Sequence, residues 1–113
     1  MAQAKTDAFP AELVALAGAA RALAHPGRLQ LLLTIAARSS CVCGDLVESM
    51  PLAQSTVSQH LKELKEAGLI RGEIDGPRTC YCLDPETLES VRQGFARLFA
   101  GLECCGPKDG DGS

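Results

Sequence analysis

The sequence predicts a mainly α-helical protein with a small β-hairpin, and three observations lead to this prediction. Apolar residues make up 46% of the 113 residues, which is enough for one folded domain. There is no Trp, and there are only one Tyr and three Phe, so the core must be aliphatic, which suits packed helices. Apolar residues recur at helical spacing through most of the chain, and a turn signal separates two strand-like runs.

The first two helices are each expected to begin near a proline. Pro10 lies near the start of the first helix and Pro26 at the start of the second, because proline is tolerated in the first helical turn. Each helix has an apolar face at helical spacing. In the first helix this face consists of Leu13, Leu16, Ala20 and Leu23. In the second helix it consists of Leu29, Leu32, Leu33, Ile35 and Ala36.

A pair of helices is expected in the middle of the chain. Cys41–Cys43 is predicted to be extended, a brief helix runs from Asp45 to Met50, and a longer one runs from about Gln54 to Ala67. Gly68 is the expected C-terminal cap of the longer helix. Its core positions, spaced i, i+4 and i+7, are Val57, Leu61 and Leu64.

A hairpin and a last helix complete the expected elements. Leu69–Ile74 and Arg78–Leu83 are predicted strands, because a Gly-Pro turn signal lies between them. Asp84 is placed to cap the last helix, with Pro85 at its first position. The apolar stripe of that helix consists of Leu88, Val91, Phe95, Leu98, Phe99 and Leu102. The sequence thus predicts about five helices and a two-stranded hairpin.

These elements are expected to form a single domain. It covers residues 10–105, between a flexible leader at residues 1–9 and a disordered, glycine-rich tail at residues 106–113. No segment approaches the roughly 20 apolar residues needed to span a bilayer. The N-terminus lacks the apolar run of a signal peptide. We therefore expect a cytoplasmic protein without a membrane partner.

The element order is that of a winged helix-turn-helix: two helices, a tight turn between them, and then a hairpin. Opposite its core face, the helix from Gln54 carries small polar side chains, which can approach base edges and phosphates in a major groove. The net charge is −3, but residues 54–82 carry four basic and four acidic groups, so the deficit lies elsewhere. A solvated helix face is the competing interpretation, and the element order favours DNA. The candidate DNA-binding residues are Gln54, Ser55, Thr56, Ser58, Gln59, Lys62 and, at the hairpin tip, Arg78.

Three segments resemble the ArsR/SmtB family of winged helix-turn-helix repressors, and in particular its arsenic- and antimony-responsive ArsR type. Residues 22–32 are similar to the entry into the family's second helix, Gln54–Leu64 to its recognition helix, and residues 67–85 to the hairpin region. The similarity extends from about residue 13 to residue 100. It implies a repressor rather than an enzyme: a homodimer, built mainly from the first and last helices, that binds an inverted repeat in double-stranded operator DNA.

Six cysteines occur as three close pairs. A reducing cytosol disfavours a structural disulfide framework, so metal, metalloid or redox chemistry is the better interpretation. Thiolates select soft ions, of which As(III) and Sb(III) are examples. The segment from Cys41 to Leu46 also resembles the arsenic-sensing motif of the family. The candidate ligands are Cys41, Cys43, Cys104 and Cys105, with Cys80 and Cys82 as weaker candidates.

The position of Cys41–Cys43 suggests how an inducer would act. In an extended segment, Cys41 and Cys43 share one face while Val42 points to the core; in a helical segment they point apart and the segment must unwind to chelate. Pairing with the second hairpin strand would bring both cysteines close to Cys80 and Cys82. Chelation by these thiolates would distort the start of the DNA-reading helices and favour a state that releases DNA.

Other signals and ions remain open. Zinc is less favoured than As(III) or Sb(III), because the last helix has no histidine to act as a ligand. His25 and His60 are expected to be structural or close to DNA. A cysteine pair could instead form a disulfide, which would make the protein a thiol-redox or sulfide-responsive repressor. A thiol-disulfide enzyme is disfavoured, because no βαβ pattern surrounds the cysteines.

Overall fold

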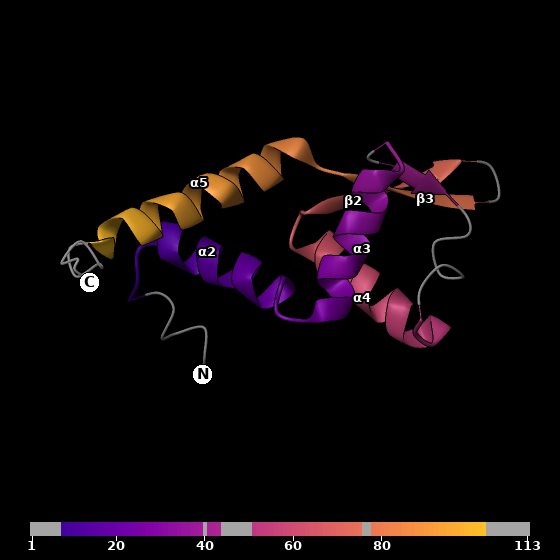
Figure 1. The fold of residues 1–113 in the computed structure, drawn as a ribbon, viewed down its shortest axis with the longest axis horizontal. Coiled ribbons are helices and arrows are strands. Elements are labelled where there is room, and N and C mark those ends of the chain that lie inside the picture. The colour runs from indigo at the N-terminus through magenta and orange to yellow at the C-terminus, as the bar shows by residue number, and fades with distance from the viewer. Residues whose placement is uncertain (1–7, 40, 44–50, 76–77, 104–113) are drawn as a thin grey trace, which may run out of the picture.

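The computed structural model describes residues 8–39, 41–43, 51–75 and 78–103 (Figure 1). Its elements in these ranges are α2 (Ala11–Ala22), α3 (Pro26–Ala37), β1 (Cys41–Cys43), α4 (Gln54–Glu66), β2 (Ile70–Asp75), β3 (Arg78–Leu83) and α5 (Pro85–Gly101). The predicted mainly helical fold with a hairpin is confirmed. The brief helix expected at residues 45–50, the turn at residues 76–77, most of the leader and the whole tail lie outside the described residues.

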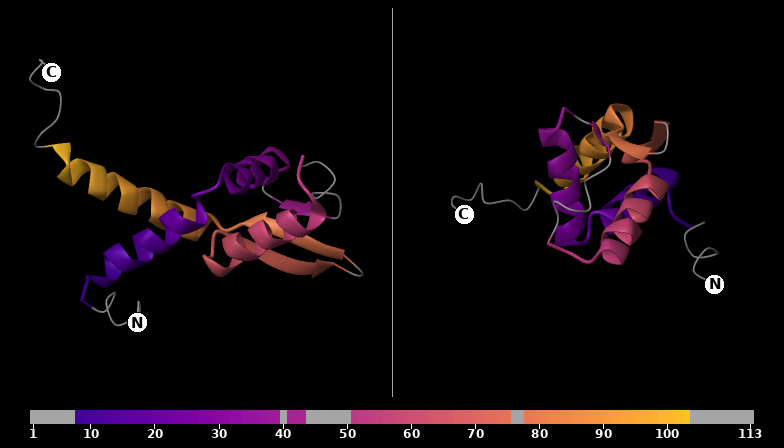
Figure 2. Two further views of the ribbon diagram at one scale, coloured as in Figure 1. Left: turned by 90° about the horizontal axis from the view of Figure 1, so that it is seen from below. Right: turned by 90° about the vertical axis from the view of Figure 1, so that its right-hand side faces the viewer.

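The elements form two parts, which we call the arm and the head. The arm consists of α2 and α5, which lie side by side, and the head consists of α3, α4 and the three strands (Figures 1 and 2). In the arm, Arg97 Nε donates a hydrogen bond to Glu12 Oε2 at 3.0 Å. Gly94 packs on Leu16 so closely that a Cβ atom there would lie 3.0 Å from Leu16 Cδ1. A glycine at this position therefore lets the two helices approach each other.

The core of the head is aliphatic, and helix α4 contributes the face that its sequence predicts. Val57, Leu61 and Leu64 are between 0% and 4% exposed, which confirms their assignment to the core. The complete core cluster consists of Ala22, Leu31, Ile35, Val42, Val57, Leu61, Leu64, Leu69 and Ile70.

The predicted buried face of α3 is partly wrong. Leu31 and Ile35 are fully buried, whereas Leu29 and Leu33 are 44% and 66% exposed. Residues four apart lie on one side of a helix, so the pair at 31 and 35 defines the side that packs on the core. Leucines surround this helix on most sides, and periodicity alone therefore selected the wrong members.

Three local signals set the helix ends; those at Asp84 and Gly68 were predicted from the sequence, and the cap at His25 was not. The Nδ1 atom of His25 accepts a hydrogen bond from the Gly27 amide at 2.8 Å and caps α3. Asp84 Oδ1 accepts one from the Thr87 amide at 3.1 Å and caps α5. Gly68 follows α4 with a φ of +81°, the left-handed conformation that favours glycine. His25 and Asp84 fix where α3 and α5 begin, and Gly68 fixes where α4 ends.

The sheet has three antiparallel strands in the order β1-β3-β2, so the hairpin is joined by one more strand. The register pairs Cys41 with Cys82, Val42 with Tyr81 and Cys43 with Cys80. This confirms the expected pairing of the extended cysteine segment with the second hairpin strand. Val42 is 4% exposed and points into the core, also as expected. No helix of the described residues is long and apolar enough to cross a bilayer.

Candidate functional site

The outer face of α4 is polar and open to solvent. Gln54, Ser55, Ser58, Gln59 and Lys62 are exposed, and Thr56 is half-buried. The helix ends at the edge of the head in Figure 1. The buried apolar face behind it fixes the rotation of the helix, so the five exposed side chains are presented outward together. Their assignment as DNA-binding residues stays a prediction.

One of these side chains already has a partner. Gln59 Nε2 donates a hydrogen bond to Glu63 Oε2, four residues later on the same helix, at 3.0 Å. An amide that is to contact a base edge must give up or share this bond. Glu63 thereby restrains Gln59 in the free protein, a relation that the spacing i, i+4 makes visible in the sequence.

The hairpin contributes less that can be described. Arg78 begins β3 and lies opposite Asp75 in the register. The side chain of Arg78 lies outside the described part of the structure, so its role at the tip stays a prediction. Arg71, on β2, is exposed.

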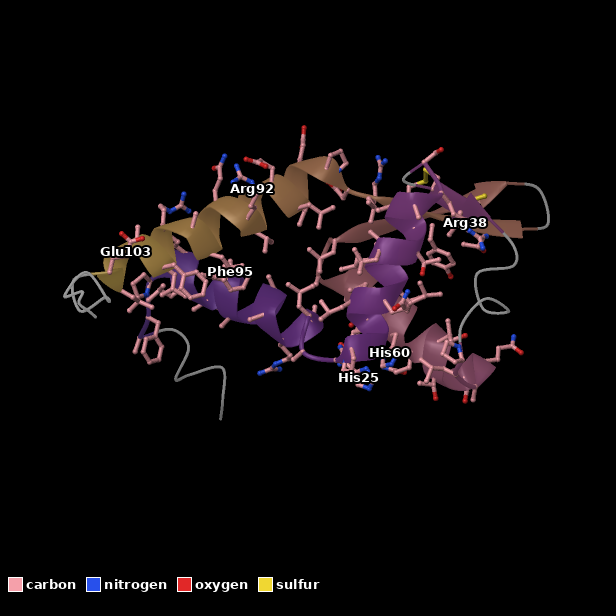
Figure 3. All side chains as sticks on the ribbon, viewed as in Figure 1. His25, Arg38, His60, Arg92, Phe95 and Glu103 are labelled. Atoms are coloured by element: carbon pink, nitrogen blue, oxygen red, sulfur yellow. A yellow bond between two sulfur atoms is a disulfide. The ribbon has the colours of Figure 1, made fainter. Side chains whose placement is uncertain are left out.

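Two histidines meet where α3 packs on α4: His25 caps α3, and His60 belongs to the buried side of α4 (Figure 3). The ring centroids of His25 and His60 are 4.3 Å apart, and His60 is only 6% exposed. Burial lowers the pKa of His60, and the nearby His25 and Arg28 lower it further. A Cβ atom on Gly27 would lie 3.0 Å from His60 Nε2, so glycine lets α3 approach this ring. His25 and His60 thus have structural positions between α3 and α4.

The sequence did not predict the polar groups buried around this contact. Within the described residues, neither Arg28 Nε nor His60 Nε2 has a hydrogen-bond partner. Neutral His60 avoids placing a second positive charge beside the Arg28 guanidinium. The interface between α3 and α4 is therefore packed around an imidazole that stays uncharged at neutral pH.

The cysteines of β1 and β3 lie on adjacent strands of the sheet. Cys41 and Cys82 are opposite one another and are joined by a disulfide, with their Cα atoms 4.0 Å apart. Cys41 is exposed, whereas Cys82 is 5% and Cys80 is 6% exposed. Backbone register places Cys43 opposite Cys80. The sequence predicted that the two pairs would be neighbours, but it did not identify which cysteines are partners.

The two C-terminal candidate ligands are not among the residues that the structure describes. Cys104 and Cys105 lie outside the described residues. Within the part of the chain that the structure describes, no group of three or more His, Cys, Asp and Glu side chains is arranged to hold a metal ion. The described residues therefore offer a cross-strand cysteine pair, and the wider assignment of metal ligands stays a prediction.

Comparisons with known proteins agree with this arrangement. Residues 25–71 match the family described as bacterial regulatory protein, arsR family. The arsenical resistance operon repressor of Bacillus subtilis is 36% identical over 93 residues, which cover 81% of this chain and 82% of that protein. The HTH-type transcriptional repressor SmtB of Mycobacterium tuberculosis is 41% identical over 83 residues. These residues cover 73% of this chain but only 61% of the length of SmtB.

A solved structure extends the comparison to the fold. The homodimeric winged helix-turn-helix DNA-binding domain of Mb0332 from Mycobacterium bovis, a possible ArsR-family regulator, has a TM-score of 0.62 and 26% identity. The match covers 82% of this chain and 83% of that domain. The arm and the head therefore occur together in a known architecture.

Proposed function

Since the chain belongs to the ArsR family of DNA-binding transcriptional regulators, which are not enzymes, we propose that it is a metal- or metalloid-responsive repressor of the cytosol. It binds operator DNA as a homodimer and dissociates when As(III) or Sb(III) binds its cysteine thiolates. The observation that carries this proposal is the outward polar face of α4, held by a fully buried apolar face behind it and flanked by a hairpin.

The α4 face has the chemistry for DNA recognition. Glutamine can make a bidentate contact with adenine, serine and threonine hydroxyls can contact bases or phosphates, and Lys62 suits a phosphate. The partial positive charge at the N-terminus of α4 adds an attraction for the phosphate backbone. In this proposal Gln54, Ser55, Thr56, Ser58 and Gln59 face the major groove, and Arg78 contacts the minor groove or backbone.

The apolar surface of the arm supports the proposal of a homodimer. Five large apolar side chains of the arm are between 39% and 59% exposed: Phe9 just before α2, Leu13 in α2, Leu98 and Phe99 in α5, and Leu102 at the C-cap of α5. Exposed apolar groups concentrated on two adjacent helices mark an interaction surface. The similar Mb0332 domain is homodimeric. A twofold dimer presents two copies of α4, which suits an inverted repeat.

The cysteine thiolates support the proposal that the inducer is a soft ion. Cys41, Cys43, Cys104 and Cys105 are the proposed ligands of As(III) or Sb(III), because soft thiolates select soft ions. The similarity to the arsenical resistance operon repressor of Bacillus subtilis supports this choice over zinc. Cys41 is exposed and therefore accessible to an incoming ion.

The DNA assignment is tested by operator binding with a matched control. The double variant Ser58→Ala/Gln59→Ala should bind a labelled fragment of its own promoter at least about tenfold more weakly, because lost base contacts cost about 1–3 kcal/mol. The control Ser90→Ala/Gln93→Ala removes the same two exposed side-chain types from α5 and should bind normally. Fluorescence anisotropy measures both. Equal affinities would refute the assignment to α4.

The inducer assignment is tested on the fully reduced protein. The double variant Cys41→Ser/Cys43→Ser should bind the operator normally but should no longer release it on addition of arsenite. Arsenite-driven release that persists in this variant would move the sensor to Cys104 and Cys105. Release in neither the variant nor the wild type would contradict metalloid sensing altogether.

A second candidate function is favoured by the disulfide between Cys41 and Cys82. Oxidation of this pair would make the protein a thiol-redox repressor. In that case diamide should change operator affinity without any metalloid, dithiothreitol should reverse the change, and Cys82→Ser should abolish it. An operator affinity independent of diamide would remove this candidate.

A further inference from the structure

We infer that Cys41 of β1 and Cys82 of β3 form a cross-strand dithiol that captures a trivalent arsenical within one subunit. The inference deepens the proposed function by naming the pair of thiols, and it rests on that function only for the effect on DNA. It assigns the second thiol to Cys82 of the neighbouring strand rather than to Cys43 of the same strand.

Strand geometry separates these two pairings. Residues i and i+2 of an extended strand are about 6.6 Å apart along the chain, since each residue advances about 3.3 Å. The Cα atoms of Cys41 and Cys82 are 4.0 Å apart, and their sulfurs are joined. Two sulfurs that can share a bond can also approach a single arsenic atom from two sides. Cys41 and Cys43 each lie opposite a different cysteine of β3, so cross-strand pairing needs the smaller change of backbone.

Exposure gives the order of capture. Cys41 is exposed and can react first with an arsenical from solvent, whereas Cys82 is 5% exposed and can close the second bond from the interior. The thiolate is the form of each cysteine that attacks and binds soft ions.

The chemistry balances without a change in the oxidation state of arsenic. A thiol reductant such as glutathione first supplies two electrons and two protons, which convert the disulfide into two thiols, while two reductant thiols become a disulfide. Each cysteine sulfur then replaces one hydroxyl group on the arsenical. The displaced hydroxyl leaves with the thiol proton as water. Two such exchanges form two arsenic–sulfur bonds and release two water molecules.

The bridge lies where a small movement reaches both proposed DNA-contacting elements. Capture ties the reduced Cys41 and Cys82 sulfurs to one arsenic atom, so it sets the distance between β1 and β3. β1 follows α3 directly, with the Cys41 amide bonded to the Arg38 carbonyl at 3.4 Å, and it precedes α4 in the chain. β3 is the second strand of the hairpin. Capture therefore changes the position of the hairpin relative to the recognition helix.

The test uses phenylarsine oxide, which has two exchangeable positions on arsenic and so bridges exactly one pair of thiols. Wild-type full-length protein is reduced, loaded and digested with trypsin. Cleavage after Arg38, Lys62, Arg78 and Arg92 gives one peptide of residues 39–62 and another of residues 79–92. A cross-strand adduct joins these two peptides by mass, whereas a Cys41–Cys43 adduct stays within the first. An adduct found only within the first peptide overturns the inference.

Two matched variants then isolate the pair. One retains only Cys41 and Cys82, through serine at the other four cysteines, and the other retains only Cys41 and Cys43. We expect the first variant to bind phenylarsine oxide at least about tenfold more tightly and to form the cross-peptide adduct. Equal or weaker binding by the Cys41/Cys82 variant overturns the inference. Circular dichroism checks that both variants are folded, and if either is not, fragmentation of the joined wild-type peptides in the mass spectrometer identifies which cysteine of each peptide carries the arsenic.

Operator binding separates this inference from the function on which it rests. Arsenical-driven release without a cross-peptide adduct would overturn the site and leave the repressor function standing. A cross-peptide adduct in a protein that never binds its promoter would overturn the function and leave the site standing. When both hold, Cys82→Ser should raise the phenylarsine oxide concentration for half-release by at least about tenfold.

Discussion

The head and the arm bury their apolar residues to very different extents. The head encloses Leu31, Ile35, Val57, Leu64 and Leu69 completely, each at 0% exposure. In the arm, the buried residues of the described helices are small: Ala19, Ala22 and Gly94. Of its large apolar side chains, Leu13, Val14, Leu98 and Phe99 are exposed, and Leu16, Leu88, Val91 and Phe95 are half-buried. The head therefore buries its aliphatic core within one chain, whereas the arm leaves an apolar surface exposed that a second copy of the chain would bury.

The head and the arm therefore differ in the source of their stability. The burial of aliphatic side chains stabilises the head in an isolated chain. In the proposed dimer, association contributes much of the stability of the arm, which therefore depends on protein concentration. The four predictions that follow test this difference, beginning with the largest effect.

Truncation of the head core should have the largest effect. Leu64→Ala removes a fully buried side chain, and such changes cost about 2–5 kcal/mol in the free energy of unfolding. The control Leu33→Ala changes a leucine that is 66% exposed and should alter it by less than about 0.5 kcal/mol. Urea unfolding measures both. Similar losses would mean that the buried Leu64 contributes no more to the stability of the head than an exposed leucine does.

Truncation of the arm surface should weaken association instead. Phe99 is 59% exposed in one chain, and its burial in a dimer would contribute about 1.5–3 kcal/mol. Phe99→Ser should therefore raise the dimer dissociation constant at least about tenfold, measured by sedimentation equilibrium. Leu33→Ser, an exposed change in the head, is the control. A dimer of unchanged affinity in the Phe99 variant would exclude this part of α5 from the interface.

Acidification should destabilise the head through His60. The folded state lowers the pKa of His60 below its ordinary value of 6.5, mainly by burial and also through His25 and Arg28. The unfolded chain then binds a proton more readily, so the free energy of unfolding is unaffected above pH 6.5 and falls as the pH decreases below it. His60→Gln should show a weaker dependence between pH 7 and pH 5. An unchanged slope would assign the dependence to other groups.

Loss of the ion pair in the arm should have the smallest effect. Arg97 and Glu12 side chains are 59% and 61% exposed, and solvent-exposed pairs contribute little. Arg97→Gln should change the free energy of unfolding by less than about 0.5 kcal/mol, and 1 M NaCl should remove the difference. A larger loss that persists in salt would indicate that the pair is buried in the assembled protein.

The sequence predicts some parts of this molecule better than others for physical reasons. In α4, Val57, Leu61 and Leu64 stand out among polar neighbours, so helical periodicity identifies the buried face. Local caps at Gly68 and Asp84 are equally visible, because they depend on residues that are adjacent in the chain. In α3, leucines occur on most sides, and the sequence alone could not select Leu31 over Leu33.

The cysteine site depends on a contact between distant segments. Cys41 and Cys82 are separated by 41 positions in the sequence. Their pairing follows from the register of β1 on β3, and a shift by one residue would place Cys41 opposite Tyr81 or Leu83 instead. Composition identified thiol chemistry and the neighbouring pairs, but only the folded sheet shows which sulfur meets which. The assignments of Arg78, Cys104 and Cys105 stay predictions.

The central position of β3 has a consequence for how the chain can vary. This one strand begins with Arg78, carries Cys82 opposite Cys41 of β1, and leads into Asp84, the cap of α5. Side chains alternate along a strand, so deletion of a single residue would exchange its two faces and turn the sulfurs away from β1. We therefore expect β3 to accept many replacements in kind but none in length.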